Sequence, residues 1–228
     1  MAVAPFNHIT ATYSSAHALM YEAVVAPSVY RSRAIIDEKF LNLLPQNAHI
    51  LDVGSGGGLF TQYLADQRPD LTIIGIDLAE PQLKRSRKRL RDYSDRVTFQ
   101  HGDATNLAFA DRTFDGVISY GSVKHWTSRE TGMAECVRVL KPGGPLLVTD
   151  ADRSATFEDS SNFIKHYKFP RIFDGPNLAV FRTWIAGRSI DLDDARALAE
   201  GVADLVDVEV GRIPDSPLVM IAGRRTPE

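Results

Sequence analysis

The strongest structural signal in the sequence is the run HILDVGSGGGLFTQYL at residues 49–64. It begins with apolar, partly β-branched residues, which are typical of a short buried strand. A glycine cluster follows, and apolar residues then recur at helical spacing from Leu59 to Leu64. Glycines let the backbone approach a ligand closely, and the first N–H groups of a helix bind negative or polar groups. The run therefore predicts a strand, a turn and a helix start that form the floor of a ligand pocket.

The glycine spacing separates two classes of nucleotide-binding protein. Dinucleotide-binding folds use G-x-G-x-x-G, and this chain has Leu59 where the third glycine would stand. Its own pattern is Gly54-x-Gly56-x-Gly58. The next strand-like run ends in Asp77, about where a carboxylate that accepts ribose hydroxyls belongs. The two features together predict a ribose-containing ligand that is bound without the dinucleotide motif.

Composition and charge limit the class of protein. The chain has 228 residues, 44% hydrophobic and 24% charged, which fits one α/β domain with a sizeable core. A net charge of −3 gives no general attraction to nucleic acid or to an anionic membrane. Cys136 is the only cysteine, so an internal disulfide is excluded and a reducing compartment is expected. Since no apolar run approaches roughly 18 residues and residues 1–8 lack signal-peptide features, we expect a cytoplasmic protein without a membrane span.

The rest of the chain alternates strand-like and helix-like patterns, which is typical of a parallel sheet covered by helices. The last two strand-like runs are joined by six residues, 212–217, which is too short for a parallel crossover, so we expect an antiparallel pair. Strands are expected at residues 49–53, 71–77, 96–100, 114–120, 145–150, 205–211 and 218–222, and helices at 30–44, 59–66, 81–93, 128–140 and 192–202.

Five segments of the chain resemble one enzyme family when they are taken together. They are the glycine loop, Asp77, the triplet at 102–104, the strand FDGVI at 114–118 and the run RVLKPGG at 138–144. Over roughly residues 45–150 this set resembles the class I S-adenosylmethionine-dependent methyltransferases of the small-molecule type. The spacing of Phe6, Ile9 and Tyr13 is also similar to the opening of the menaquinone and ubiquinone C-methyltransferases, although Ser14 stands where those enzymes usually have aspartate.

The resemblance implies S-adenosyl-L-methionine as cofactor, S-adenosyl-L-homocysteine as its product, and no metal. The glycine loop would accommodate the methionine part, and Asp77 would accept both ribose hydroxyls. The chemistry of that last role stands alone, because a neutral diol is well bound by a bidentate acceptor. Leu78 would pack on the adenine, with Asp103 and Ala104 at its amino edge. The implied cofactor-binding residues are Gly54, Ser55, Gly56, Gly58, Asp77, Leu78, Asp103, Ala104, Ser119, Tyr120 and Tyr13.

The resemblance also gives an expected fold and layout. We predict an α/β protein with a Rossmann-like, doubly wound sheet of seven strands, mostly parallel with an antiparallel C-terminal strand. A single domain, 1–228, would consist of an N-terminal helical cover at 1–33, a cofactor-binding core at 34–152, an inserted lid at 153–190 and a C-terminal helix and strand pair at 191–228. The aromatic residues of 153–190 favour a lid over a flat or lipophilic acceptor, although a self-contained insertion is the alternative.

Methyl transfer from a sulfonium asks mainly for alignment and desolvation, because the leaving group is already good. Alignment alone can supply about 7–11 kcal/mol. A general base adds about 10²–10⁴-fold where the acceptor carries a proton that must leave. His125 and Tyr120, near the exit of the fourth strand, are the catalytic candidates, and a structural role is the alternative for both.

Three functions stay open from the sequence. The first is methyl transfer to an oxygen, nitrogen or activated carbon of a small metabolite. The second is cofactor binding on the same fold without transfer, and the third is an NAD-dependent oxidoreductase, which Leu59 disfavours. A nucleic-acid substrate is disfavoured because residues 119–122 lack the Asn/Asp-Pro-Pro motif, and the basic run at 81–93 suits a solvated helix face. A homodimer stays open. Asp52 is expected to make local hydrogen bonds, and Cys136 to lie in the core.

Overall fold

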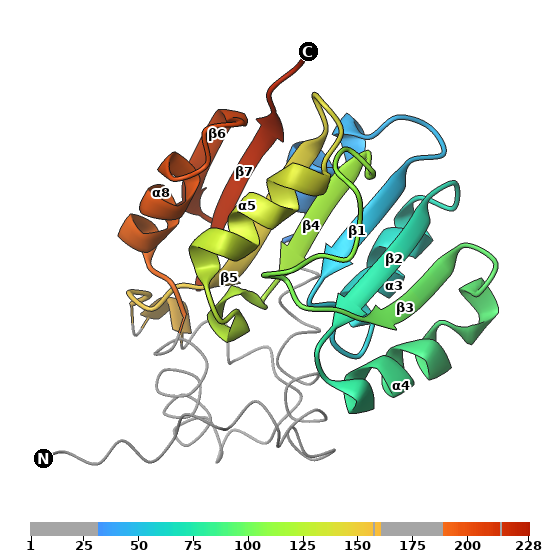
Figure 1. The fold of residues 1–228 in the computed structure, drawn as a ribbon. Helices are drawn as coiled ribbons and strands as arrows, with labels where there is room; N and C mark the ends of the chain where they lie inside the picture. Colours follow the sequence, from blue (N-terminus) through green and yellow to red (C-terminus); the bar gives the residue numbers. More distant parts are fainter. Residues whose placement is uncertain (1–31, 157, 161–188, 215) are drawn as a thin grey trace, which may run out of the picture.

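The computed structural model describes residues 32–156, 158–160, 189–214 and 216–228. These residues form one seven-stranded sheet in the order β3-β2-β1-β4-β5-β7-β6 (Figure 1). The strands are β1 His49–Val53, β2 Thr72–Asp77, β3 Val97–His101, β4 Gly116–Tyr120, β5 Pro145–Ala151, β6 Leu205–Arg212 and β7 Leu218–Arg225. The helices are α2 Arg33–Lys39, α3 Leu59–Gln67, α4 Glu80–Arg89, α5 Arg129–Val139 and α8 Leu192–Glu200, with 3₁₀ turns η2 Leu41–Leu43, η3 Arg91–Tyr93 and η4 Val123–His125.

The order of the strands reverses at β1. This strand pairs in parallel with β2 on one side and with β4 on the other, so the chain turns outward in both directions from the centre of the sheet. Four of its five residues are buried, as expected for a strand covered on both faces. In an open α/β sheet, ligands bind outside the carboxyl ends of the strands at such a reversal. The fold therefore points to the loops that follow β1 and β4.

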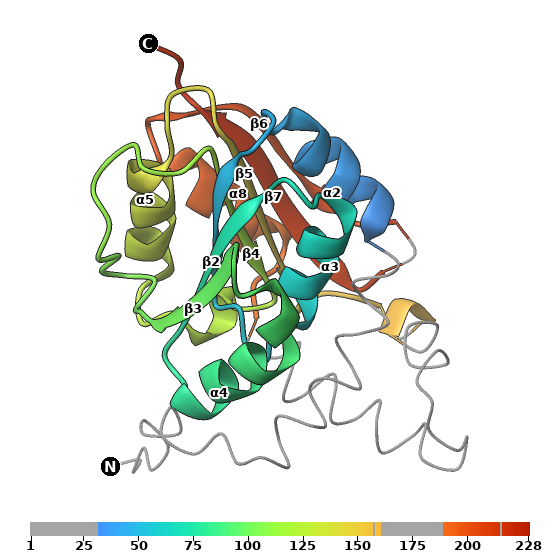
Figure 2. The same ribbon diagram turned by 90° about the vertical axis from the view of Figure 1, so that its right-hand side faces the viewer.

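Helices cover both faces of the sheet, as Figure 2 shows with α5 on one side and α2 and α3 on the other. The first face buries one core, with Ile36 of α2 and Leu64 of α3 fully inaccessible. The second face buries another, in which Met133 and Cys136 of α5 pack with Ala195 of α8. The expected core position of Cys136 is confirmed, and burial raises the pKa of its thiol to about 12.

Two predicted helices end earlier than their apolar spacing suggested. The helix predicted at 30–44 is α2 followed by η2, and it breaks at Phe40, whose φ of −139° is not helical. The break places the fully buried Phe40 ring against Gly116, where an added Cβ would come within 3.0 Å of it. The helix predicted at 81–93 is likewise α4 followed by η3. Apolar spacing did not distinguish a continuing α-helix from a 3₁₀ turn that keeps the same side buried.

The C-terminal strands close the sheet in an antiparallel manner, which confirms the prediction of a mostly parallel sheet with an antiparallel C-terminal strand. β7 lies between β5 and β6 and runs opposite to both. The register with β6 shifts between Val206 and Glu209, and Asp207 in this bulge has a φ of 53°. A two-versus-one pairing of this kind bends and twists the bulged strand.

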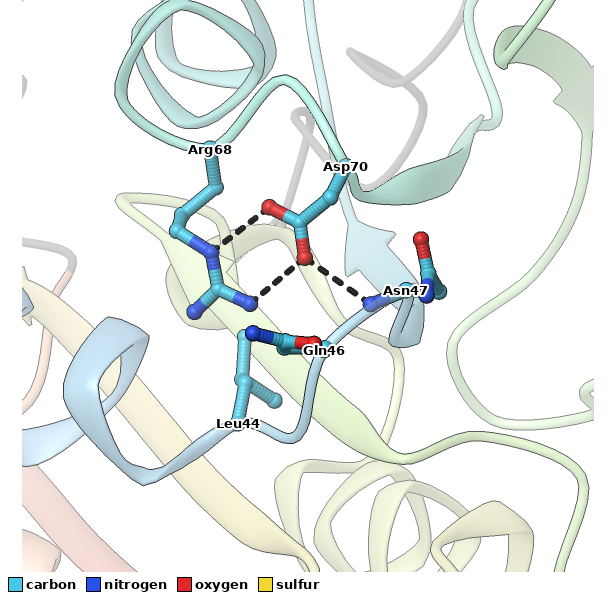
Figure 3. A pocket seen from close by; sticks show the side chains of 5 residues that line it. All are labelled: Leu44, Gln46, Asn47, Arg68 and Asp70. Atoms are coloured by element: carbon cyan, nitrogen blue, oxygen red, sulfur yellow. Dashed lines mark hydrogen bonds and ion pairs between the residues drawn. The ribbon is translucent and has the colours of Figure 1, made fainter.

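A hollow of about 380 Å³ opens beside the amino end of β1 (Figure 3). It lies at the opposite end of the parallel strands from the loops that follow β1 and β4. Its floor is an ion pair in which Arg68 grips both carboxylate oxygens of Asp70, at 2.8 and 2.7 Å. The same guanidinium donates to the carbonyls of Leu41 and Pro45, each at 2.9 Å. Asp70 also accepts the backbone N–H of Asn47. These contacts, which we call the Arg68 joint, tie the α2–β1 connection to the α3–β2 turn. The residues that line the hollow therefore have a structural role.

Replacement of Arg68 by methionine should lower the free energy of unfolding by about 2–3 kcal/mol, because two carbonyls and a carboxylate lose a charged donor. Arg68 holds the pKa of the Asp70 carboxyl below its ordinary range. A carboxyl with a depressed folded-state pKa stabilises the fold above its ordinary pKa, and this contribution disappears as the pH falls. The difference between wild type and Arg68→Met, measured by urea denaturation, should therefore shrink below about pH 4.

The matched control is Arg91→Met, since Arg91 pairs with Asp92 in a mostly exposed position. Exposed pairs contribute about 0–1 kcal/mol, so this variant should unfold almost like wild type. Equal losses in the two variants would show that the Arg68 joint carries no special stability.

Candidate active site

Four loops meet at the carboxyl edge of the parallel strands. They follow β1, β2, β3 and β4, and they contain nearly all of the predicted site residues that the structure describes. The loop after β1 is tied directly to the end of β2, because Gly54 and Ser55 both donate their N–H groups to the Ile76 carbonyl at 2.9 Å. From the other side, the Arg89 guanidinium of α4 donates to the Gly57 carbonyl at 2.7 Å. The glycine loop is thus fixed by two neighbouring elements.

The three predicted glycines all have left-handed backbone conformations, with φ of 76°, 53° and 78° at Gly54, Gly56 and Gly58. They differ in what surrounds them. A Cβ at Gly54 would stand 2.3 Å from the Ser122 Cβ, and one at Gly58 would stand 2.8 Å from the Ser86 Cβ. At Gly56 the nearest atom would be 4.0 Å away. Two glycines therefore serve close packing of the protein itself, whereas Gly56 has room beside it as far as the described residues go.

Asp77 stands where the sequence placed it, at the end of β2 beside the glycine loop. Its Oδ2 accepts the N–H of Gly56 at 2.9 Å, and its Oδ1 accepts the N–H of Ala79 at 2.8 Å. Burial raises the pKa of Asp77, and the two backbone donors oppose that rise. The next residue, Leu78, is 45% exposed. A fixed bidentate acceptor therefore lies next to an uncovered apolar surface.

Gln82, on the first turn of α4, is a residue that the sequence did not single out. It is only 6% exposed, and its Nε2 is the atom nearest to the open side of Gly56. Within the described part of the chain its Oε1 is buried without a hydrogen-bond partner. Buried polar atoms without partners are costly, so an orphaned acceptor next to the glycine loop indicates a missing donor. Gln82 is five positions after Asp77, and only the turn into α4 brings the two side chains to one loop.

The loop after β3 is held by Asp103 itself. Its Oδ1 accepts both the N–H and the hydroxyl of Thr105, each at 2.8 Å, so this carboxylate builds the turn in which it lies. Ala104 is buried at 7% exposure. The expected adenine-facing roles of these two residues stay predictions, since the contacts in the structure are those of a turn.

A chain of hydroxyl groups connects the end of β4 to the glycine loop. The Ser119 and Ser122 hydroxyls lie 2.7 Å apart, and Ser122 Oγ donates to the Val53 carbonyl at 3.0 Å. The indole N–H of Trp126 donates to the same Ser122 oxygen at 3.0 Å. From the sequence, Ser122 is expected to lie in the stretch 122–126 that faces the acceptor, without a role of its own. Its contacts make it the link between the loops after β1 and β4.

Tyr120 and His125 have different surroundings. Tyr120 is 6% exposed, and its ring stacks on that of Phe60 with the centroids 4.6 Å apart. Its hydroxyl oxygen lies 3.0 Å from the hydroxyl oxygen of Ser32. It belongs to the core on the α2 and α3 face, whereas Ser119 points to the other face. His125 is exposed at the end of η4. The structure thus places an accessible imidazole, but not the phenol of Tyr120, on the surface beside the β4 loop.

A buried ion pair lies directly beneath η4, and the sequence reading missed it. Lys124 Nζ is 2.8 Å from Asp150 Oδ1 at the end of β5, with side-chain exposures of 5% and 0%. Apolar spacing gave no sign of this contact because the two residues are 26 positions apart. The adjacency of the carboxyl ends of β4 and β5 was the signal that could have found it.

Asp52 is the second buried carboxyl near the site. It lies in β1 at 1% exposure and accepts the Thr61 hydroxyl at 2.6 Å, the kind of local hydrogen bond that was expected. Burial raises its pKa to about 7, the Thr61 hydrogen bond opposes the rise, and the nearby charge of Asp77 adds to it.

Some predictions lie outside the described residues. This group contains Tyr13, residues 1–31 of the expected N-terminal cover at 1–33, and residues 157 and 161–188 of the expected lid at 153–190. Within the part of the chain that the structure does describe, no group of three His, Cys, Asp or Glu side chains is arranged to hold a metal ion. None of the helices described is both long enough and apolar enough to cross a bilayer.

Comparison with known proteins adds independent information. Residues 51–148 match the methyltransferase domain family. The demethylmenaquinone methyltransferase of Symbiobacterium thermophilum is 40% identical over 108 residues, 46% of this chain and 43% of that protein. Methyltransferase GfsG of Streptomyces halstedii is 32% identical over 180 residues, 76% of this chain and 60% of that protein. A putative S-adenosyl-L-methionine-dependent methyltransferase from Methanococcus maripaludis has a TM-score of 0.67 at 17% identity, covering 100% of this chain and 98% of that one.

The reversal at β1, the glycine loop and the carboxylate at the end of β2 are together typical of α/β folds that bind nucleotide-like ligands at the carboxyl ends of their strands. The family match spans this region of the chain and supports the class I S-adenosylmethionine-dependent methyltransferase family predicted from its motifs. The chain covers only 43% and 60% of the two curated relatives.

Asp52 makes the stability of the fold depend on pH in a testable way. Its folded-state pKa is about 7 against an ordinary 3.8, so between these values the folded protein binds a proton that the unfolded chain has released. The contribution of this group to stability is complete below about pH 4 and is lost as the pH rises to about 7, at roughly 1.4 kcal/mol per unit. Asp52→Asn keeps the acceptor for Thr61 and removes the titration.

The measurement is urea denaturation of wild type and Asp52→Asn at half-unit intervals from pH 4.5 to 7.5. The free energy of unfolding of the variant, minus that of wild type, should increase steadily across this range. Parallel profiles for wild type and Asp52→Asn would contradict the raised pKa.

Proposed function

We propose that this chain binds S-adenosyl-L-methionine at the loops after β1, β2 and β3 and transfers its methyl group to a small acceptor next to the loop after β4. The observation that carries the proposal is the Asp77 carboxylate, which Gly56 and Ala79 hold at the carboxyl edge of β2. Each carboxylate oxygen has a second lone pair, so two backbone donors leave Asp77 able to accept the two hydroxyls of a ribose.

The residues present fit such a cofactor. Among the described residues, a Cβ at Gly56 would meet only the Gln82 Nε2, at 4.0 Å, which allows close approach to the backbone and places an amide hydrogen-bonding group beside it. Leu78 supplies an exposed apolar surface for a base. The proposed cofactor-binding residues are those expected from the sequence, namely Gly54, Ser55, Gly56, Gly58, Asp77, Leu78, Asp103, Ala104, Ser119, Tyr120 and Tyr13, with Gln82 added.

The mechanism rests on positioning. The bound cofactor would supply an activated methyl group on a positively charged sulfur. The chain's own contribution is to fix the loops after β1 and β4 against each other, through Ser122 and the Val53 carbonyl, so that the donor and acceptor subsites keep one geometry. His125, exposed on η4, is the group we assign to the acceptor, to orient it or to take its proton. The Tyr120 hydroxyl already lies against Ser32, which favours a supporting role for it.

The acceptor we propose is small and flat or lipophilic, with oxygen, nitrogen or activated carbon as the methylated atom. The name of the Symbiobacterium relative, demethylmenaquinone methyltransferase, supports an acceptor of this class. The aromatic content of 153–190 supports it as well, since ring-rich segments bind flat molecules by stacking. The single, buried cysteine supports a cytoplasmic location.

The first test of the proposal is cofactor affinity. Wild type should bind S-adenosyl-L-homocysteine in isothermal titration and bind NAD far more weakly. Asp77→Asn keeps one oxygen for the backbone donors but cannot accept at both positions, and an unpaired hydroxyl costs about 1–3 kcal/mol. The dissociation constant should rise about tenfold or more. Asp70→Asn, a carboxylate at the opposite edge of the sheet, should leave it unchanged; equal affinity in folded Asp77→Asn would refute the ribose assignment.

The second test separates transfer from binding. Wild type is incubated with a metabolite mixture and methyl-labelled S-adenosyl-L-methionine, and labelled products identify the acceptor. His125→Ala should then lower turnover by about 10²-fold or more with that acceptor while the affinity for S-adenosyl-L-homocysteine stays the same. Undiminished turnover would leave His125 a surface residue. Tight cofactor binding without any labelled product would favour the alternative of a binding protein on this fold.

A further inference from the structure

Among the ion pairs of the described residues, Lys124 and Asp150 form the one in which both side chains are most completely buried, at 5% and 0% exposure, and the proposed chemistry does not use it. Besides the ammonium at 2.8 Å, Asp150 Oδ1 accepts the N–H of Ala151 at 2.7 Å, and Oδ2 accepts the backbone N–H of Lys124 at 2.9 Å. The ammonium also donates to the Gly121 carbonyl. Burial raises the pKa of Asp150, and the charge and hydrogen bonds of Lys124 outweigh it, so the pKa lies below its ordinary value.

Such a pair is an expensive way to fill a core. Each ion loses several kcal/mol of hydration, and apolar residues of similar volume are often as stable or more stable. What an apolar pair cannot supply is the set of directed hydrogen bonds to the backbone. Here those bonds reach both ends of one turn, the Gly121 carbonyl and the Lys124 N–H. The pair therefore fixes the shape of the turn more than it adds to the stability of the fold.

The turn that it fixes presses on the glycine loop. Gly121 leaves β4 with a left-handed φ of 75°, and the next residue, Ser122, is the one that leaves no room for a Cβ at Gly54. The Ser122 hydroxyl donates to the Val53 carbonyl, one residue before Gly54. A shift of this turn would therefore move the start of the glycine loop or break its hydrogen bond to β1.

We propose that Lys124 and Asp150 are positioning residues, which act through the turn at 121–126 to hold the glycine loop in its binding shape. They touch neither Gly54 nor Asp77, and their influence passes through Ser122. The proposal rests on the function proposed above, because its measured quantity is cofactor affinity. It assigns to the acceptor side of the site an indirect part in cofactor binding.

The test compares stability with affinity in Lys124→Met/Asp150→Asn. This double variant removes both charges, keeps the buried volume and one side-chain acceptor, and loses the ammonium contact with Gly121. Its thermal midpoint should lie close to that of wild type, because no unpaired charge is left behind. Its dissociation constant for S-adenosyl-L-homocysteine, measured by isothermal titration, should be about tenfold higher. Wild-type affinity in the folded double variant would overturn the proposal.

The matched control is Lys141→Met/Asp115→Asn. This second Lys–Asp pair, 2.7 Å apart, is more exposed and lies at the amino end of β4, so its removal should leave the affinity unchanged. Ser122→Ala covers the case in which the first double variant does not fold, because it removes only the hydroxyl contacts and buries no charge. It should also weaken binding, by about threefold or more, and full affinity in Ser122→Ala would overturn the relay.

The two proposals fail differently. If wild type does not bind S-adenosyl-L-homocysteine at all, the proposed function is wrong. If wild type binds, Asp77→Asn weakens binding, and Lys124→Met/Asp150→Asn does not, then only the positioning role is wrong.

Discussion

The hydrogen bond from the Gly56 N–H to the Asp77 carboxylate joins the two loops on which the rest of the site is built. It requires a left-handed backbone at Gly56 and places a partly buried carboxylate at the end of β2. Both demands are met only because β1 and β2 are parallel neighbours whose carboxyl ends share an edge. The reversal of strand order at β1 then adds the loop after β4 to the same edge. The position of the site and the groups that it offers to a ligand therefore both follow from the order of the parallel strands.

Much of this arrangement could be predicted from local sequence, because its determinants are close together in the chain. The buried strands are visible in the sequence as apolar runs, and the glycine loop is visible as a fixed spacing of glycines. Asp77 is visible as the polar residue that ends the apolar run of β2. The 3₁₀ turns were missed for a physical reason. Residues such as Phe40 stay buried whether the helix continues or tightens, so burial periodicity carries no information on the change.

The parts that the sequence did not predict depend on pairs that meet only in the folded protein. Lys124 follows β4 in the turn η4, and Asp150 lies near the end of β5. The sequence around either residue gives no indication that the two side chains form a pair. Gln82 has the appearance of an ordinary polar helix residue until α4 is packed, when its Nε2 lies beside Gly56 and its Oε1 is buried without a donor among the described residues. Charged and polar groups of this kind are conspicuous by their burial, and burial is a property of the whole fold.

The bulge in β6 has a consequence for how the protein behaves at high concentration. In the described chain β6 is the outermost strand and pairs with β7 alone, so its far side presents backbone donors and acceptors. The extra residue at Asp207 interrupts the regular spacing of those backbone groups. Glu209 of β6 also forms an ion pair with Lys39 of α2. A second copy cannot add itself there as an eighth strand without a mismatch in register. The bulge thus disfavours growth of the sheet through β6.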